Sequence, residues 1–193
     1  MANTSATSPG TMANDSAVGT EAWNNPDYAK GSDDNRAWNN SGFGDPALPF
    51  ITNYLKATNF GFEIPTGATI NGILVEIERS ERSGFGSVYD SEVKIVKADG
   101  SIGTTNKADT ATAWTGTDSY FEYGASDDLW GETWSVTDIN DSDFGAVLAA
   151  NVFSGLFVNA GVNHIRITVY YTETTSSTIT GVQTAQGINT ITF

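Results

Sequence analysis

The chain contains no cysteine, a single histidine and only nine lysine and arginine residues among its 193 residues. Without cysteine it has neither a disulfide framework nor thiolate chemistry. A single histidine excludes the usual zinc sites with two or more histidines, and any Ser-His-Asp triad would have to use His164 as its base. His164 opens a strand-like run and faces away from its apolar side, so we expect no triad and no enzymatic activity.

Positive charge is scarce, and the formal net charge is −14. Between Lys107 and Arg166 there are nine acidic residues and no lysine or arginine. Nucleic-acid affinity depends largely on basic side chains that displace counterions, so we expect no nucleic-acid partner and no binding to anionic membranes. An acidic surface can attract cations; the alternative is that it is solvated and aids solubility.

Long apolar runs are also missing. No stretch approaches the roughly 20 apolar residues that cross a bilayer, and residues 1–10 combine no basic start with an apolar segment. We therefore expect a protein made in a cytoplasm, without a secretory signal.

What the chain does have is a repeated two-residue alternation. In the run 164–172, Ile165, Ile167 and Val169 share one face, while His164 and Arg166 share the other. Twenty glycines and many Asn, Ser and Thr residues favour turns over helices. Further strands are expected over 53–62, 70–78, 91–97, 119–123, 144–151 and 152–159. For the last two segments the alternative is one strand and a short helix. The pattern predicts an all-β protein, an antiparallel β-sandwich of the jelly-roll type with about eight strands.

Local signals refine this prediction. A polar loop is expected over 79–89, and Asp99-Gly100 favours a hairpin turn with a short return strand over 101–104. Thr137 is expected to cap a single helical turn that ends near Asp141.

The sequence divides into three parts. Residues 1–20 cannot bury enough apolar area to offset their ordering entropy, so we expect a flexible N-terminal arm. Residues 21–172 would form the β-sandwich domain. Residues 173–193 read as a linker and a C-terminal strand or arm, which either folds back on its own sheet or completes the sheet of another subunit. Ile191 and Phe193 are its candidate contact residues.

Five tryptophans stand out. Ala-Trp-Asn-Asn occurs at 22–25 and again at 37–40. We expect Trp23 and Trp38 to anchor this irregular segment on the core; the alternative is an exposed pair that contacts sugar or protein. Further candidate contact residues lie in later loops: Trp114, Trp130 and Trp134.

Oxygen ligands gather in one short stretch: Asp138, Asn140, Asp141 and Asp143. Hard cations prefer such ligands, so a structural calcium ion is the alternative to our expectation of no cofactor. An EF-hand loop beginning at Asp138 does not match, because its sixth and twelfth positions are Asp143 and Ala149. The favoured interpretation is that these residues cap a helix and form turns. Glu76 and Glu78 share a strand face, but solvated charges explain that pair better than glycoside hydrolysis.

Several segments resemble structural proteins of tailed bacteriophages: 55–79, 128–131, 140–145 and 164–171. The resemblance extends over about residues 21–172. It implies a β-sandwich component of the virion, such as a capsid decoration protein, head fibre, turret or tail appendage. Such a protein is not an enzyme, and its partners are other capsid or tail proteins.

We therefore expect a structural virion protein that forms a homo-oligomer and binds the capsid or tail through loops and terminal arms. The alternative is a carbohydrate-binding module or adhesin, which tryptophans lying open on one face would favour.

Overall fold

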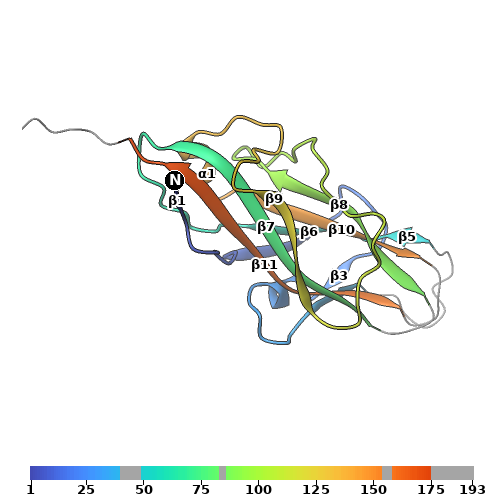
Figure 1. Cartoon of the computed structure of the whole chain (residues 1–193). Coiled ribbons are helices and arrows are strands. Elements are labelled where there is room, and N and C mark those ends of the chain that lie inside the picture. Colours follow the sequence, from blue (N-terminus) through green and yellow to red (C-terminus); the bar gives the residue numbers. More distant parts are fainter. Residues whose placement is uncertain (40–48, 83–85, 154–157, 175–193) are drawn as a thin grey trace, which may run out of the picture.

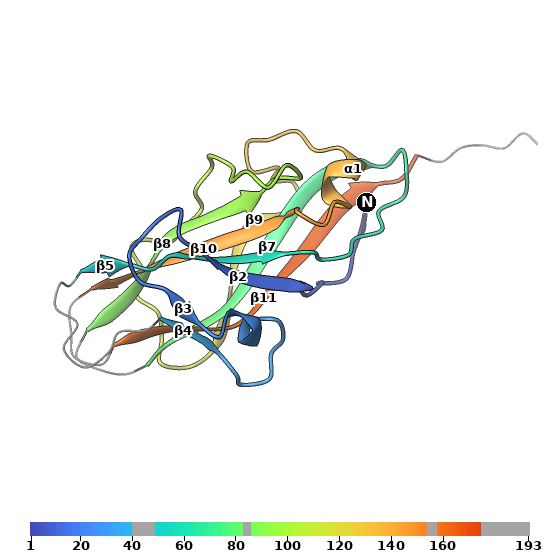
Figure 2. The same ribbon diagram turned by 180° about the vertical axis from the view of Figure 1, so that it is seen from behind.

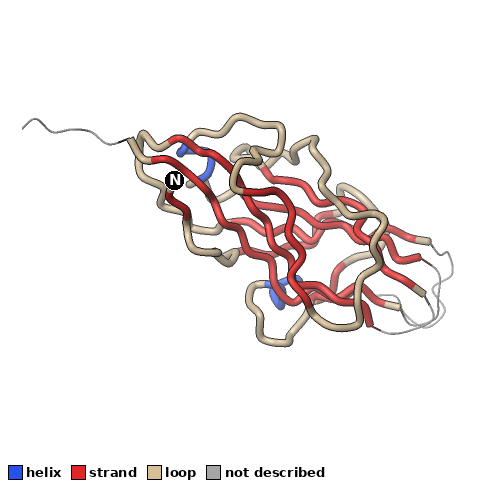
Figure 3. The backbone as a smooth tube through the Cα atoms, viewed as in Figure 1, coloured by secondary structure: helices blue, strands red, loops and turns tan. Residues whose placement is uncertain are grey.

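The computed structural model describes residues 1–39, 49–82, 86–153 and 158–174, and these ranges are almost entirely β-structure (Figures 1 and 3). Two antiparallel sheets pack against each other around one main hydrophobic core. The described helices are the short η1 (Pro26–Ala29) and α1 (Val136–Ile139). Within these ranges, no helix is long and apolar enough to cross a membrane.

The first sheet is built on the two longest strands, which pair along almost their whole length. Its strand order is β3 (Trp23–Asn24), β4 (Ala37–Asn39), β11 (Asn159–Thr172), β7 (Thr69–Arg82) and β9 (Ser119–Ala125), and β1 (Ala2–Asn3) also pairs with β11. Ile73, Val75 and Ile77 of β7 point into the core, as the two-residue alternation predicts.

The second sheet lies behind the first and is seen best in Figure 2. Its order is β2 (Thr11–Asp15), β6 (Tyr54–Thr58), β10 (Gly145–Phe153) and β5 (Phe50–Ile51), with β8 (Ser87–Val96) along the other edge of β10. The outer edge of β8 is covered by residues 102–114. The backbone N–H groups of Gly103, Lys107 and Trp114 in this segment donate to carbonyls of β8 over 2.8–2.9 Å.

The chain changes sheet at every step from β6 to β11. This crossing pattern gives the β4-β11-β7-β9 and β6-β10-β8 orders of a jelly roll in which the irregular segment 102–114 stands beside β8 in place of a strand. The prediction of an all-β antiparallel sandwich is confirmed.

The N-terminal segment differs from the expected flexible arm. β1 pairs with Tyr170 and Tyr171, Thr7 forms a bridge with Ile167, and β2 pairs with β6. Residues 1–20 therefore belong to both sheets. The compositional argument considered only apolar side chains, whereas this segment is held by main-chain hydrogen bonds to the second edge of β11, which would otherwise be open.

Three local predictions also change. β7 continues to Arg82 and β8 begins at Ser87, so the expected loop over 79–89 is much shorter. The return strand over 101–104 is reduced to one bridge between Ile102 and Val96. Residues 152–153 belong to β10 and residue 159 begins β11, while 154–157 lie outside the described residues. The C-terminal strand or arm falls mostly on 175–193, also outside them.

A charged pair is buried between the two sheets. Arg79 of β7 and Asp90 of β8 are 0% and 1% exposed, and Arg79 Nε lies 3.3 Å from Asp90 Oδ1. The Tyr123 hydroxyl donates to Asp90 Oδ2 (2.8 Å) and accepts from Arg79 Nε (3.0 Å). Trp114 Nε1 donates to Asp90 Oδ1 (2.8 Å). Burial, followed by the neighbouring Asp90 charge, raises the pKa of Tyr123, so its hydroxyl keeps the proton that it donates.

The Arg79 guanidinium also lies between two aromatic rings. Its carbon is 3.7 Å from the ring centroid of Phe121 and 4.7 Å from that of Trp114. Within the described residues, Nη1 and Nη2 have no hydrogen-bond partner. Ring faces attract the cation and replace part of the hydration that it loses on burial. The pair therefore depends on groups from β8, β9 and the segment 102–114.

Removing one member of the pair should cost far more than removing an exposed charge. We expect Asp90→Asn or Arg79→Met to lower the free energy of unfolding by about 3–5 kcal/mol, because the remaining charged or polar group is left buried without its partner. The double variant should be more stable than the sum of the two losses predicts. Urea unfolding measures all three, with Glu122→Ala on exposed β9 surface as the near-neutral control. Additive losses would contradict the coupling.

Candidate functional site

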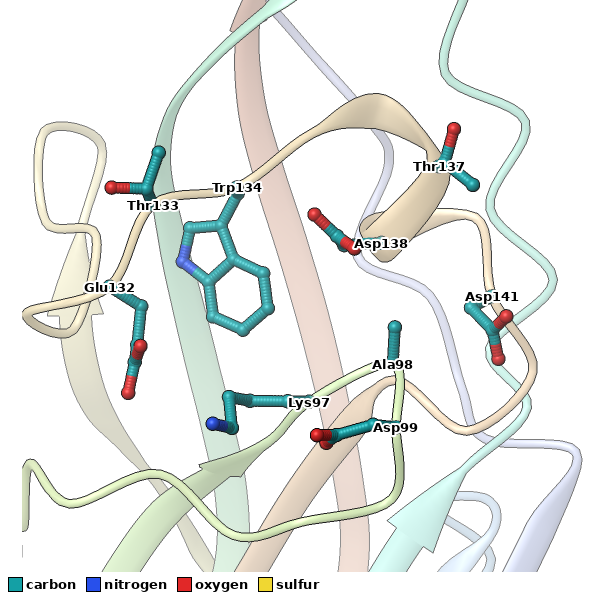
Figure 4. A pocket seen from close by; sticks show the side chains of 9 residues that line it. All are labelled: Lys97, Ala98, Asp99, Glu132, Thr133, Trp134, Thr137, Asp138 and Asp141. Carbon is teal, nitrogen blue, oxygen red and sulfur yellow. The ribbon is translucent and has the colours of Figure 1, made fainter.

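A hollow of about 450 Å³ opens between the turn that follows β8 and the segment around α1 (Figure 4). Its lining residues are Lys97, Ala98, Asp99, Glu132, Thr133, Trp134, Thr137, Asp138 and Asp141. Three of them, Trp134, Asp138 and Asp141, are candidates that the sequence singled out for two different reasons. The fold brings them to one place together with a lysine and an aspartate from the turn at 97–99.

A capping box fixes α1 at one side of the hollow. Ser135 has extended backbone and its hydroxyl accepts from the N–H of Asp138 (3.1 Å), while Asp138 Oδ2 accepts from the N–H of Ser135 (2.8 Å). The expected N-cap Thr137 is wrong, because Ser135 and the carboxylate three residues later satisfy the free N–H groups reciprocally.

Trp134 forms the apolar part of the hollow. Its indole N–H donates to the carbonyl of Leu129 (2.9 Å), and its ring packs edge-on against Phe144 with the centroids 5.3 Å apart. The residue is 9% exposed. In Figure 4 the ring lies between the side chains of Glu132 and Asp138, so a small patch of indole is open to a ligand in the hollow.

The polar lining carries four carboxylates and one ammonium group, that of Lys97. Hydrogen bonding from Ser101 holds the pKa of Asp99 below its ordinary value, so this carboxylate stays ionised at neutral pH. Asp99 Oδ1 accepts from Ser101, and Asp141 Oδ1 accepts from the N–H of Asp143 (2.9 Å). The hollow is thus lined by carboxylate acceptors and by one strong donor, the ammonium group of Lys97.

Three of the four candidate calcium ligands have other roles. Asp138 caps α1, and the side chain of Asn140 bonds both the N–H and the carbonyl of Ile64 (2.9 and 3.0 Å). Asp141 closes a turn on Asp143. The part of the chain that the structure describes contains no group of three or more His, Cys, Asp or Glu residues that could hold a metal ion. The structure thus shows the capping and turn roles that the sequence favoured for these residues.

Three of the other four tryptophans belong to the core rather than to a surface. Trp114 and Trp130 are 2% and 1% exposed, and Trp130 Nε1 donates to the carbonyl of Ile73 (2.9 Å). Trp23 is buried and donates to the carbonyl of Asn53, so its predicted anchoring role is confirmed, while Trp38 is half-buried. The contact candidates Ile191 and Phe193 lie outside the described residues.

A second polar cluster covers the outer face of the first sheet, and sequence reasoning missed it. His164 Nε2 lies 2.9 Å from the Ser8 hydroxyl, and His164 Nδ1 lies 2.8 Å from the Tyr120 hydroxyl. Ser8 is 156 residues away from His164, so no local motif signals this contact. Beside it, Arg166 binds Glu76 through two hydrogen bonds of 2.9 and 2.6 Å.

The Ser8–His164 distance suits a nucleophile and its base, but the surroundings do not complete a catalytic site. The third group is a phenol, and because burial raises the pKa of Tyr120, it stays neutral rather than acting as a carboxylate would. Neither Ser8 nor His164 lines the hollow around Trp134. Glu76 pairs with Arg166 and is not poised opposite Glu78. We conclude that this cluster holds the N-terminal segment on β11.

His164 should make stability depend on pH. Burial, followed by the charge of Arg166, lowers the pKa of His164 from its ordinary value of 6.5, so the unfolded chain takes up this proton at higher pH than the folded protein does. The contribution to stability is full above about pH 6.5 and is lost as the pH falls through the folded pKa. Urea unfolding from about pH 8 to pH 5 measures this slope, and His164→Gln should flatten it. An unchanged slope would rule out His164 as its source.

Comparisons of the chain with protein-family models, with curated proteins and with solved structures give no match. The resemblance to phage structural proteins therefore stays a prediction. Function has to be inferred from the residues and the geometry of the sandwich.

Proposed function

We propose that the protein is a non-enzymatic structural component of a tailed-phage virion, attached to the capsid or tail as a homo-oligomer. The observation that carries the proposal is that the buried ionisable side chains form contacts within the molecule that stabilise the fold. Arg79, Asp90 and Tyr123 join the two sheets, and His164 fixes the N-terminal segment on β11. A sandwich whose polar and aromatic groups serve stability in this way suits a scaffold that acts through its surface.

An apolar end of the sandwich supports a contact role. Ile51 of β5 and Phe153 of β10 are 40% and 54% exposed, and their strands pair next to these residues. A hollow of about 470 Å³ lined by Gly19, Thr20, Pro49, Phe50 and Ile51 lies at the same strand. Grouped exposed apolar side chains mark contact surfaces more often than single ones do.

Association with particles tests this proposal. Virions purified from a lysate in which the chain is made from its own phage genome should contain it, and electron microscopy should place it on head or tail. The Ile51→Asp, Phe153→Asp double variant should show at least tenfold less of the protein on particles, because it puts charge into the apolar contact. Tyr28→Asp, at an exposed residue on η1, is the control. Particles that assemble without the protein would overturn the proposal.

A second candidate is glycan binding in the hollow around Trp134. An indole patch surrounded by carboxylate acceptors and the ammonium of Lys97 matches the apolar face and the hydroxyl groups of a sugar. Trp114 and Trp130 are buried, whereas Trp134 lines the hollow and is the tryptophan that this candidate uses.

Glycan-array binding followed by calorimetry tests the second candidate. Glu132→Gln should weaken binding of the best sugar about tenfold, since it replaces a charge-assisted hydrogen bond worth about 1.5 kcal/mol. Glu122→Gln, which is remote from the hollow, should leave the affinity unchanged. Silence across the array, or equal effects of the two variants, would exclude the hollow as a sugar site.

A further inference from the structure

One long strand of the first sheet has an open edge. Within the described residues, β9 pairs only with β7, whereas β7 and β11 have partners on both edges (Figure 1). In the second sheet, β6 and β10 are likewise flanked on both sides, and β8 is covered by 102–114. Apart from shorter edge strands such as β2 and β3, β9 is thus the principal described strand with main-chain groups available for another strand.

The sequence of β9 does not protect this edge. Ser-Tyr-Phe-Glu-Tyr-Gly-Ala contains neither lysine nor proline, the residues that commonly block strand addition. Gly124 has a φ of 87° and ends the regular part of the strand, so Ser119–Tyr123 remain extended. Phe121 packs against the core but is only partly buried. The hydrophobic core is therefore not fully covered along β9.

We propose that residues 188–193 of a second copy of this chain add to β9 as an antiparallel strand. This run, Ile-Asn-Thr-Ile-Thr-Phe, is rich in residues that favour strands. Ile191 and Phe193 have the same two-residue spacing as the inward Phe121 and Tyr123, so they extend the core face beside them. The inference deepens the proposed function, on which it rests, by naming how copies join.

Charge supports this occupant. Residues 175–193 contain no charged side chain, although the whole chain has a net charge of −14. Two copies repel each other over most of their acidic surfaces. A segment without charged side chains reaches the β9 edge of a neighbour without bringing further acidic side chains to it.

The place where the described chain ends also favours a second copy. The Thr174 hydroxyl donates to the carbonyl of Gly67 (2.7 Å), which holds the end of β11 beside the turn before β7. The direct path across β7 to its own β9 edge meets the turn at 126–128, whose Asp128 carbonyl accepts from Ile73 N–H (2.9 Å). The 13 residues from 175 to 187 extend to about 45 Å, enough to reach a neighbouring molecule.

The absence of cysteine allows a direct test with purified protein and no particle. The Ser119→Cys variant places a thiol at the exposed start of β9. It is mixed with the Ile191→Cys or the Phe193→Cys variant under mild oxidation. We expect a disulfide-linked heterodimer with at least one of the two partners. Thr11→Cys on the β2 edge is the matched control and should yield at least fivefold less heterodimer.

Light scattering after size exclusion gives the second measurement. The unmodified chain should be oligomeric, and the Ile191→Asp, Phe193→Asp double variant monomeric, while Ile179→Asp in the same segment should leave the oligomer intact. The inference is overturned if the chain is monomeric, if the mixed cysteines do not react above the control, or if a disulfide forms only with both cysteines in one molecule. Failure to bind particles would instead count against the proposed function.

Discussion

The burial of Arg79 opposite Asp90 is the constraint on which the rest of the sandwich depends. Two charges are stable between sheets only where neighbours replace the water that they lose. Those neighbours come from separate parts of the chain, because Tyr123 belongs to β9 and Trp114 to the segment 102–114. The pair therefore fixes where β7, β8, β9 and this irregular segment meet, and any shift of one strand leaves a buried charge without its partner.

The buried pair also explains why the outer edge of β8 is covered, whereas the outer edge of β9 has no strand partner among the described residues. Residues 102–114 lie beside β8 because Asp90 accepts hydrogen bonds from the indole of Trp114 and from the N–H of Asp109. These side-chain hydrogen bonds supplement the few main-chain hydrogen bonds to β8, where a regular strand would form a continuous ladder. This segment covers the edge of the second sheet. It does not form a strand beside β9, so within the described residues the corresponding edge of the first sheet has no strand partner.

Sequence patterns predicted the elements whose stability comes from alternation alone, such as β7 around Val75 and β11 around Ile167. They ended β7 too early because Arg79, although in phase with Ile77, is charged, and the buried partner that pairs with it lies on another strand. They also missed the pairing of residues 1–20, since main-chain bonds to an open edge leave no trace in composition. For the candidate site, local spacing found Trp134, Asp138 and Asp141, but Lys97 joins them only through the fold.

The acidic stretch between Lys107 and Arg166 limits which surfaces of two copies could pack together in the proposed oligomer. Some of its carboxylates form contacts within the molecule: Asp138 caps α1, and Asp118 accepts a hydrogen bond from Arg36. The others keep the surface acidic, and identical surfaces repel one another. In the proposed oligomer, contacts between copies would therefore fall where charge is absent, namely on uncharged segments and strand edges. Because a strand edge binds through main-chain groups, its attraction does not depend on the sign of the side chains around it.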